Sequence, residues 1–474
     1  MKTEDAYTRL KTLSNYSETY RNLADSLANK NKVMSMSFDY ADEKIPDFMK
    51  HYEYPVSAVP VIISQKDIKK HNRFIERIIP LIYRALDVYF KGDESLFSRY
   101  LNEPEFLLPL ILNTPYEPGK FFIRYDALFS DNEFKVLEIN VGSTVGGWQH
   151  DWLSPVTIEN LHNATDVDRS NVSHHNVTKA MFSSLYKEIS KDASRTSANV
   201  LIFTSEQTDF QTESFKAEYR KVWANTQQSL RGQLYFFDNF DDLVFTNQGE
   251  LHFEGEKIDA ILLTMAEGIF VPNEIMLKLL TCSMRNNLVF PDNPAITIVG
   301  NKSVLALVHE TKFLASLNQE DVSFIQSHIP WTSKVEDKEI LWQGTPHSLL
   351  SFLQDKKEQL VVKKARSQQG KDVYVGRYCS PGKWNEAIEK ALQGHDWIVQ
   401  QYCESDEFLC LDADGKLLPT KPVWGVFDID SAYSGAFLRA ELTDSQNGVI
   451  NSSNGAIEFM VLEENPVKRK RLML

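Results

Sequence analysis

Several features that would assign a broad class at once are missing from this 474-residue chain. No apolar run reaches the roughly 18 residues of a membrane-spanning helix, and the polar start MKTEDAYTRLK lacks the apolar segment of a secretion signal. The cysteines form no CxxC pair, so we expect reduced packing thiols rather than a metal site or a disulfide. They are Cys282, Cys379, Cys403 and Cys410. We therefore expect a cytoplasmic protein that has no membrane partner.

An excess of basic residues is missing as well. The formal net charge is −14 at pH 7, whereas a protein that binds nucleic acid normally presents a basic surface. We therefore expect no nucleic-acid partner. The basic run KRKR at 468–471 departs from this balance. We interpret it as a solvated tail, with a localisation signal or a contact for an acidic partner as the alternative.

The chain does have the composition of a large globular protein, with 42% hydrophobic and 24% charged residues. Its length predicts roughly two to four structural units, because single cores stop growing below this size. Amphipathic helices are predicted over 1–32 and 65–91, and the polar stretch 160–178 shows no clear periodicity. From 199 to 285 strands alternate with helices, which predicts a parallel sheet in a Rossmann-like unit. This unit contains neither G-x-G-x-x-G nor GxxxxGK[ST], so it need not bind a nucleotide.

The most informative segment is FFIRYDALFSDNEFKVLEINVGSTVGG at 121–147. Two runs rich in aromatic and β-branched residues flank the turn sequence SerAspAsn, which predicts a hairpin. Arg124 and Asp126 stand two apart on the first strand, and Glu138 and Asn140 stand two apart on the second, so all four point to one face. Two carboxylates and an amide oxygen suit Mg²⁺, which usually shares its ligands with substrate phosphates. The alternative is an exposed hairpin with ordinary surface charges.

Two lysines follow much later in the chain. Lys302 comes after Asn301, which has the character of a helix cap, and we expect a helix through Glu310. Lys363 lies in the apolar strand LVVKK, where a lysine needs an anionic partner, and Lys364 is the exposed alternative. The polar loop ARSQQGK that follows is suited to fold over phosphates. Taken alone, Lys302 has the alternative of a solvated helix lysine.

Together these motifs resemble the circularly permuted branch of the ATP-grasp enzymes, which includes the glutathionylspermidine synthetases. In that family an acid and a later Glu-x-Asn pair hold the Mg²⁺ ions that bridge the phosphates of ATP, and Asp126, Glu138 and Asn140 match this pattern. The resemblance assigns Lys302 and Lys363 to the α- and β-phosphates and the loop around Gly370 to a lid. In this chain the lysines follow the acids, which is the order typical of the permuted branch. The resemblance covers roughly 118–160 and 290–462.

The resemblance also assigns the other end of the nucleotide. The segment WIVQQYCESDEF at 397–408 matches the hinge whose backbone reads adenine, through Gln400, Gln401 and Tyr402. An acid beyond it binds the ribose in that family, and Glu407 or Glu404 stands at a suitable interval.

Near the end of the chain, Arg439 and an Asn451 to GlyAla signature match groups that face the γ-phosphate. Arg439 lies between apolar neighbours in FLRAEL and should project inward, with a surface pair to Glu441 as the alternative.

We therefore expect an α/β protein with an ATP-grasp fold in circularly permuted order and a Rossmann-like pre-ATP-grasp unit. The expected units are a mainly helical region at 1–117, the first part of the core at 118–197, the Rossmann-like unit at 198–298, the small nucleotide-binding subdomain at 299–403, and the rest of the core with the basic tail at 404–474.

The expected function is an ATP- and Mg²⁺-dependent carboxylate-amine ligase that forms an amide or peptide bond through an acyl phosphate. Arg124 and Arg439 would stabilise the transferred group. The partners would be a small-molecule or peptide carboxylate and an amine, and a homodimer is possible. A nucleotide-binding regulatory protein and a small-molecule kinase remain alternatives. A zinc site at His150, His162, His174 and His175 is disfavoured, because these histidines lack ligand spacing.

Overall fold

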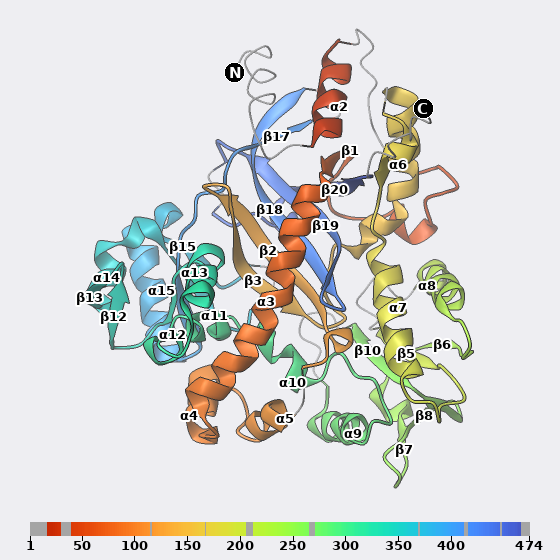
Figure 1. Cartoon of the computed structure of the whole chain (residues 1–474), viewed down its shortest axis with the longest axis horizontal. Helices are drawn as coiled ribbons and strands as arrows, with labels where there is room; N and C mark the ends of the chain where they lie inside the picture. Colours follow the sequence, from red (N-terminus) through yellow and green to blue (C-terminus); the bar gives the residue numbers. More distant parts are fainter. Residues whose placement is uncertain are drawn as a thin grey trace, which may run out of the picture.

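The fold is mixed α/β and is built around one eight-stranded sheet (Figure 1). The computed structural model describes residues 17–29, 39–113, 116–165, 167–204, 212–264, 271–367, 370–411, 416–445 and 448–465. Along the sheet the strands are β1 (Val56–Ile63), β20 (Ile457–Glu464), β19 (Ala432–Leu442), β18 (Leu417–Ile429), β2 (Phe122–Ser130) and β3 (Glu133–Val141). Two short strands, β17 (Phe408–Leu411) and β4 (Val172–Ser173), pair with β18 and β20. β1 and β20 are parallel and the other pairs are antiparallel. The sheet therefore joins strands from opposite ends of the chain.

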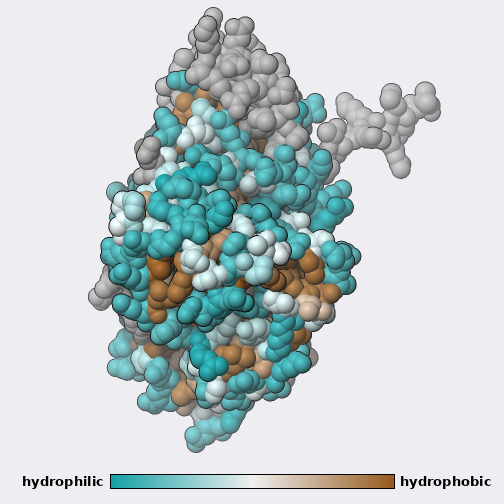
Figure 2. Space-filling model, turned by 90° about the vertical axis from the view of Figure 1, so that its left-hand side faces the viewer, coloured by the Kyte–Doolittle hydropathy of each residue, from teal (hydrophilic) through white to brown (hydrophobic). Residues whose placement is uncertain are grey.

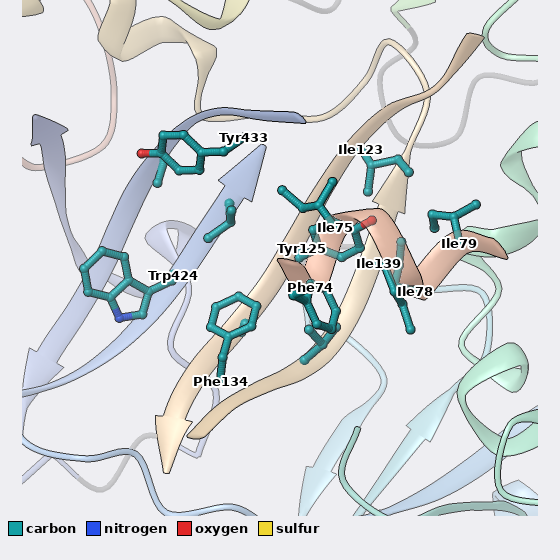
Figure 3. Close-up of a cluster of buried hydrophobic side chains, with 14 of the residues drawn as sticks. Phe74, Ile75, Ile78, Ile79, Ile123, Tyr125, Phe134, Ile139, Trp424 and Tyr433 are labelled. Atoms are coloured by element: carbon teal, nitrogen blue, oxygen red, sulfur yellow. The ribbon is translucent and has the colours of Figure 1, made fainter. Parts of the chain in front are cut away.

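One face of this sheet packs against the long helix α3 (Gln65–Phe90), which crosses in front of it in Figure 1. The helix begins at a capping box in which Ser64 and Asp67 bond each other's backbone. Its apolar stripe meets the strands at Tyr125 and Ile139, as Figure 3 shows for Phe74 and its neighbours. This is the face that the sequence predicted for Tyr125 and Ile139. The opposite face packs against α6 (Ser154–Ala164) and α7 (Val177–Ser190).

A smaller antiparallel sheet lies to the left of the eight-stranded sheet in Figure 1. Its strands are β11 (Thr332–Lys334), β16 (Trp397–Gln401), β14 (Leu360–Lys364) and β15 (Val373–Val375). The surrounding elements are the hairpin of β12 (Glu339–Trp342) and β13 (Thr345–Ser348) and the helices α14 (Leu349–Asp355) and α15 (Pro381–Gly394). Its own apolar core contains Trp384, Phe352 and Val399. Figure 2 shows this side of the molecule, where apolar side chains form separate patches in a hydrophilic surface.

The Rossmann-like unit is a three-stranded parallel sheet with helices, as predicted. Its strands are β10 (Ala260–Thr264), β5 (Val200–Thr204) and β6 (Leu234–Phe237), and its helices are α8 (Glu213–Thr226) and α9 (Asn273–Met284). A small antiparallel sheet of β7 (Val244–Phe245), β8 (Leu251–Phe253) and β9 (Glu256–Ile258) lies between β6 and β10 in the chain. The remaining α-helices are α2 (Glu18–Asn29), α4 (Glu94–Leu101), α5 (Leu107–Asn113), α10 (Pro294–Thr297), α11 (Ser303–Leu307), α12 (Thr311–Leu314) and α13 (Gln319–His328).

Most local predictions agree with the structure, with a few differences. The helix predicted at 1–32 is observed as α2, and the rest of that prediction lies outside the described residues. The helix expected from Lys302 through Glu310 was too long, because α11 ends at Leu307 and α12 begins at Thr311. Helices α6 and α7, which border the polar stretch 160–178, were not predicted. The buried side of α7 carries Thr178, Ser184 and Glu188, and these polar residues interrupt the apolar pattern by which a helix is predicted from sequence.

All the cysteines are free thiols, as expected. Across the described ranges, no helix combines the length and apolar character needed to cross a membrane.

Candidate functional site

The site is built on the face of β2 and β3 that points away from α3. In the hairpin Arg124 stands opposite Asn140, and Asp126 stands opposite Glu138. Residues that stand directly opposite each other share a face of a sheet. A β-bulge between Asp126 and Ala127 shifts the register by one residue, so that Asp126 stands opposite Glu138 while Ala127 stands opposite Val136. The structure therefore brings the four predicted residues together on one face.

Asp126 is the centre of a buried charge cluster. Arg124 donates to both of its oxygens, with Nε 2.8 Å from Oδ1 and Nη2 3.1 Å from Oδ2. Arg439 Nη2, which arrives from β19, lies 2.9 Å from Oδ2. Burial alone would raise the pKa of Asp126, but the two arginines outweigh it and lower the pKa to about 2. Arg439 thus projects inward, as predicted, and the alternative pair with Glu441 is not formed.

The two arginines rest on one aromatic ring. Their guanidinium carbons lie 5.6 Å (Arg124) and 5.2 Å (Arg439) from the ring centre of Phe437. The ring passes over β18 at Gly425, where a Cβ would come within 2.2 Å of it. It also passes beneath Gly147, whose φ is +97° and whose Cβ would approach it to 2.4 Å. A side chain at either glycine would displace the ring, so both positions require glycine for close approach.

Lys302 reaches the hairpin from just before α11. Its Nζ lies 2.8 Å from Glu138 Oε1 and donates to the carbonyl of Ser367 at 2.9 Å. Its own amide donates to Ala365, so the residue is fixed to the start of the loop that follows β14. The N-cap of α11 is Lys302 itself, and Asn301, one residue earlier, accepts the amide of Ser303 at 3.0 Å. With a buried ammonium, Lys302 is not a solvated helix lysine.

Lys363 is also buried, and its partner is an amide. Its Nζ donates to Gln400 Oε1 at 2.7 Å, and Gln400 in turn donates to Thr332 at 3.2 Å. Burial lowers the pKa of Lys363 to about 8; Glu138 partly offsets this and Lys302 adds to it. Both ends of the Gln400 side chain are therefore used in hydrogen bonds within the protein, and the oxygen fixes the position of Lys363.

The predicted adenine segment lies at the link between the small sheet and the core sheet. The amide of Gln401 donates to Trp331 at 2.7 Å, and that of Tyr402 donates to Gln359 at 2.7 Å, so both donors are used within the protein. Their side chains line an open hollow of about 400 Å³. The hollow is lined by Ser130, Asp131, Lys135, Gln326, Pro330, Gln401, Tyr402, Cys403, Glu404, Ser405 and Asp406.

The ribose candidates differ in their surroundings. Glu404 pairs with Arg377 and lies 3.6 Å from Lys421. Glu407 directly precedes β17 and is partly buried.

The loop around Gly370 contacts the C-terminal segment. A Cβ on Gly370 would lie 2.7 Å from Val449, and one on Gly448 would lie 3.1 Å from Val375. Asn451 follows directly, and its carbonyl accepts the amides of Asn454 and Ala456. The predicted phosphate loop and the predicted Asn451 signature therefore lie side by side.

Sequence reasoning missed Glu458, which stands opposite Arg439 on β20. This buried carboxylate accepts hydrogen bonds from His150 Nε2 at 2.7 Å, from the Tyr52 hydroxyl at 2.9 Å and from Ser452. It thus ties together segments before β1, after β3 and before β20. The signal was present, because an acid in the apolar strand IEFMVLEE needs a partner just as Lys363 does.

The histidines considered as zinc ligands are engaged elsewhere. His174 Nε2 lies 2.9 Å from Asp151, and His175 Nδ1 lies 3.2 Å from Glu463. Within the part of the chain that the structure describes, no group of three or more His, Cys, Asp or Glu residues is arranged to hold a metal ion. Mg²⁺ does not require such a closed cage, since it binds through one or two carboxylates together with water and phosphate. Asp126, Glu138 and Asn140 fit that donor set, and the low pKa of Asp126 keeps it ionised.

Comparison with solved structures shows the fold. The chain is similar to a glutathione synthetase-like effector from Globodera pallida, with a TM-score of 0.54 and 10% sequence identity over 86% of this chain and 90% of the other. A candidate gamma-glutamylcysteine synthetase from Methylobacillus flagellatus gives 0.40 at 11% identity, over 80% of this chain and 86% of the other, and this likeness is too low to carry an argument. No protein-family model and no curated protein sequence matches the chain. The chain thus shares the fold of this glutathione synthetase-like effector.

Proposed function

We propose that this protein is an ATP-dependent carboxylate-amine ligase with a permuted ATP-grasp core, which forms an amide or peptide bond and releases ADP and phosphate. The observation that carries the proposal is the ion pair between Lys302 and Glu138. It places a candidate phosphate-binding lysine directly on the candidate metal hairpin, although the two residues are far apart in the chain. The synthetase-like fold of the structural neighbour supports the same class.

The charges of the site support a nucleotide ligand. Four basic groups (Arg124, Arg439, Lys302 and Lys363) face two carboxylates (Asp126 and Glu138). With all groups ionised the set is positive by about two charges, which complements the roughly two negative charges of an Mg–ATP complex. Buried ion pairs contribute little to stability on balance, so a structural need alone does not account for them. They hold the basic groups in place, and the phosphates of a nucleotide can take the place of the carboxylate partners.

Each residue then has a defined task. Lys302 and Lys363 would exchange Glu138 and Gln400 for phosphate oxygens, which fixes the nucleotide. Arg124 and Arg439 already face the shared oxygens of Asp126 and would stabilise the phosphoryl group in transfer and the tetrahedral oxyanion. Mg²⁺ held by Asp126, Glu138 and Asn140 would neutralise charge on the phosphates. The hollow beside Gln401 and Tyr402 would receive the base, with Glu407 or Glu404 at the ribose.

The decisive experiment follows the products. The protein is incubated with Mg–ATP and a pool of carboxylic acids, with hydroxylamine as the nucleophile, and ADP, AMP and hydroxamate are measured. A ligase releases ADP and forms hydroxamate only with its proper acid, because hydroxylamine traps an acyl phosphate. Release of AMP and pyrophosphate would contradict the proposal, and a stable phosphorylated product would indicate a kinase.

The neighbour is described as an effector, which keeps a nucleotide-binding regulatory role as the second candidate. Protection of the fold by Mg–ATP without turnover of any acid would favour that role. Ligand that binds only the native state at a hundredfold excess over Kd stabilises it by about 2.7 kcal/mol. A rise of the melting temperature with Mg–ATP thus distinguishes a protein that binds ATP from one that does not.

A further inference from the structure

Two buried histidine-carboxylate pairs lie close together in the chain and differ in one respect. His174 pairs with Asp151, and its second ring nitrogen lies 3.4 Å from the carbonyl of Val461. His150 pairs with Glu458, but its Nδ1 has no hydrogen-bond partner among the described residues. The ring is only 1% exposed. Buried polar atoms are normally satisfied, so this vacant nitrogen needs an explanation.

His150 lies beside the aromatic ring that supports the two arginines of the proposed site. Its ring meets Phe437 edge-on, with centres 5.5 Å apart, and Phe437 is the ring on which both arginines rest. Its partner Glu458 stands directly opposite Arg439 on the neighbouring strand. The turn at 146–147, which leads to His150, also contacts Arg124. Nη1 of Arg124 donates to the carbonyl of Gly146 at 3.0 Å. The imidazole is thus part of the same assembly as the two arginines.

Glu458 determines which nitrogen of the imidazole carries the proton. Burial alone would raise the pKa of this carboxyl, but hydrogen bonds from His150, Ser452 and Tyr52 lower it. An ionised carboxylate only accepts hydrogen bonds, so Nε2 of His150 must be the donor. Nδ1 then carries the lone pair. A base whose other nitrogen is oriented by a carboxylate is the arrangement that proton transfer requires.

We propose that His150 Nδ1 accepts the proton that the ammonium form of the amine substrate must lose before it can attack the acyl phosphate, an inference that rests on the proposed ligase function. Glu458 stabilises the imidazolium that results. The uncharged nitrogen then forms a bond to the acyl carbon, the bond between that carbon and the phosphate oxygen breaks, and phosphate leaves with the electron pair and with the second proton that the nitrogen loses. Glu458 is the positioning residue of the pair.

The test uses nucleophiles that differ in their need for a base. A primary aliphatic amine is an ammonium ion near neutral pH and must lose a proton, whereas hydroxylamine is already uncharged there. His150→Gln keeps an N–H donor for Glu458 and removes the base. We expect amide formation from a panel of amino acids and polyamines to fall by about 100-fold or more, and hydroxamate formation to fall by no more than about threefold. Equal loss with both nucleophiles would overturn the proposal.

Matched variants distinguish a role of His150 as a base from a purely structural role in packing. His174→Gln removes the other buried histidine, whose Nδ1 is engaged, and Tyr52→Phe removes another donor to the same oxygen of Glu458. Both should lower the melting temperature without changing the ratio of amide to hydroxamate. A change in that ratio as large as that of His150→Gln would contradict the assignment.

A second readout does not depend on turnover or on folding of the variant. In wild-type protein labelled with ¹⁵N-histidine, His150 should show the tautomer that is protonated at Nε2, and a proton on Nδ1 would overturn the proposal. If the wild-type protein releases no ADP with any acid, the proposed function fails and this inference with it. If it does turn over and the two nucleophiles respond alike to His150→Gln, only this inference fails.

Discussion

In the β2–β3 hairpin the two faces of the sheet are made by alternate residues of the same strands, yet they are held there by different forces. On the face toward α3, Tyr125 and Ile139 pack against Phe74 and the isoleucines that follow it (Figure 3). Each fully buried side chain of this kind contributes about 1.5–3 kcal/mol. On the other face, Arg124, Asp126 and Glu138 are fixed by ion pairs, whose gain is largely cancelled by desolvation. The α3 face therefore supplies stability, and the site face supplies chemistry.

The largest expected effect is on the α3 face, at Phe74. Its ring lies 5.2 Å from Tyr125 and 5.4 Å from Phe134, and it also contacts Phe324 and His328. Phe74→Ala should cost about 3–5 kcal/mol of unfolding free energy, measured by urea denaturation. The folded fraction should still bind Mg–ATP with the wild-type Kd at low temperature. A loss below about 1 kcal/mol would contradict the division between the faces.

The next effect is on the site face, at Glu138. Glu138→Gln keeps an oxygen that can accept from the buried ammonium of Lys302, so the variant should lose no more than about 3 kcal/mol of unfolding free energy and remain folded. ADP release should nevertheless fall by about 100-fold or more, because a carboxylate of the proposed metal site is lost. Glu133→Gln, on the exposed start of the same strand, is the control and should turn over normally. Equal rates in the two variants would remove Glu138 from the site.

Local periodicity was sufficient to predict the contrast between the faces. The two-residue spacing of Arg124 and Asp126 on one strand, and of Glu138 and Asn140 on the other, follows from strand geometry alone. Lys363 and Arg439 were found because a charge in an apolar strand needs a partner. The parallel sheet of the Rossmann-like unit followed from its alternation of strands and helices.

The partners of those charges could not be predicted. Arg439 meets Asp126 only because β18 lies between β19 and β2, a pairing that spans some three hundred residues. The commitment of Gln400 to Lys363 likewise depends on the register of β14 against β16. The pairing of Glu458 with His150 was missed because long-range topology, and not local spacing, brings the two residues together.

A smaller effect is a pH dependence of nucleotide binding. Because burial lowers the pKa of Lys363 to about 8, the free site loses this positive charge as the pH rises through that value. Nucleotide phosphates favour the charged form, so the affinity for ADP without metal should fall above pH 8, by up to about tenfold per pH unit. Titration calorimetry between pH 7 and 9 measures this. Lys363→Met should abolish the slope, whereas Lys364→Met, the adjacent exposed lysine, should retain it. A wild-type affinity that is constant across this range would contradict the role of Lys363.

The smallest effect concerns a carboxylate on the α3 face. Asp428 accepts the hydroxyl of Tyr125 at 2.8 Å, and burial raises its pKa to about 7, against an ordinary value near 4. Between these values the native protein holds a proton that the unfolded chain has lost. The stabilisation is thus complete below about pH 4 and disappears as the pH rises through 7.

From pH 6 to 8 the unfolding free energy of the wild-type protein should fall by roughly 1 kcal/mol more than that of Asp428→Asn. The asparagine cannot ionise and still accepts a hydrogen bond from the Tyr125 hydroxyl. Urea unfolding at the two pH values measures the difference. Asp430→Asn, two residues later at a position paired with Lys187, should keep most of the wild-type slope, because the charge of Asp430 contributes less to the raised pKa of Asp428 than burial does. If Asp428→Asn instead kept the wild-type slope, another group would have to cause the pH dependence of stability. Asp428 would then have no measurable part in it. If the slope is lost as expected, the pH dependence of stability belongs to Asp428 in the eight-stranded sheet and that of nucleotide binding to Lys363 in the small sheet, and each can be changed without altering the other.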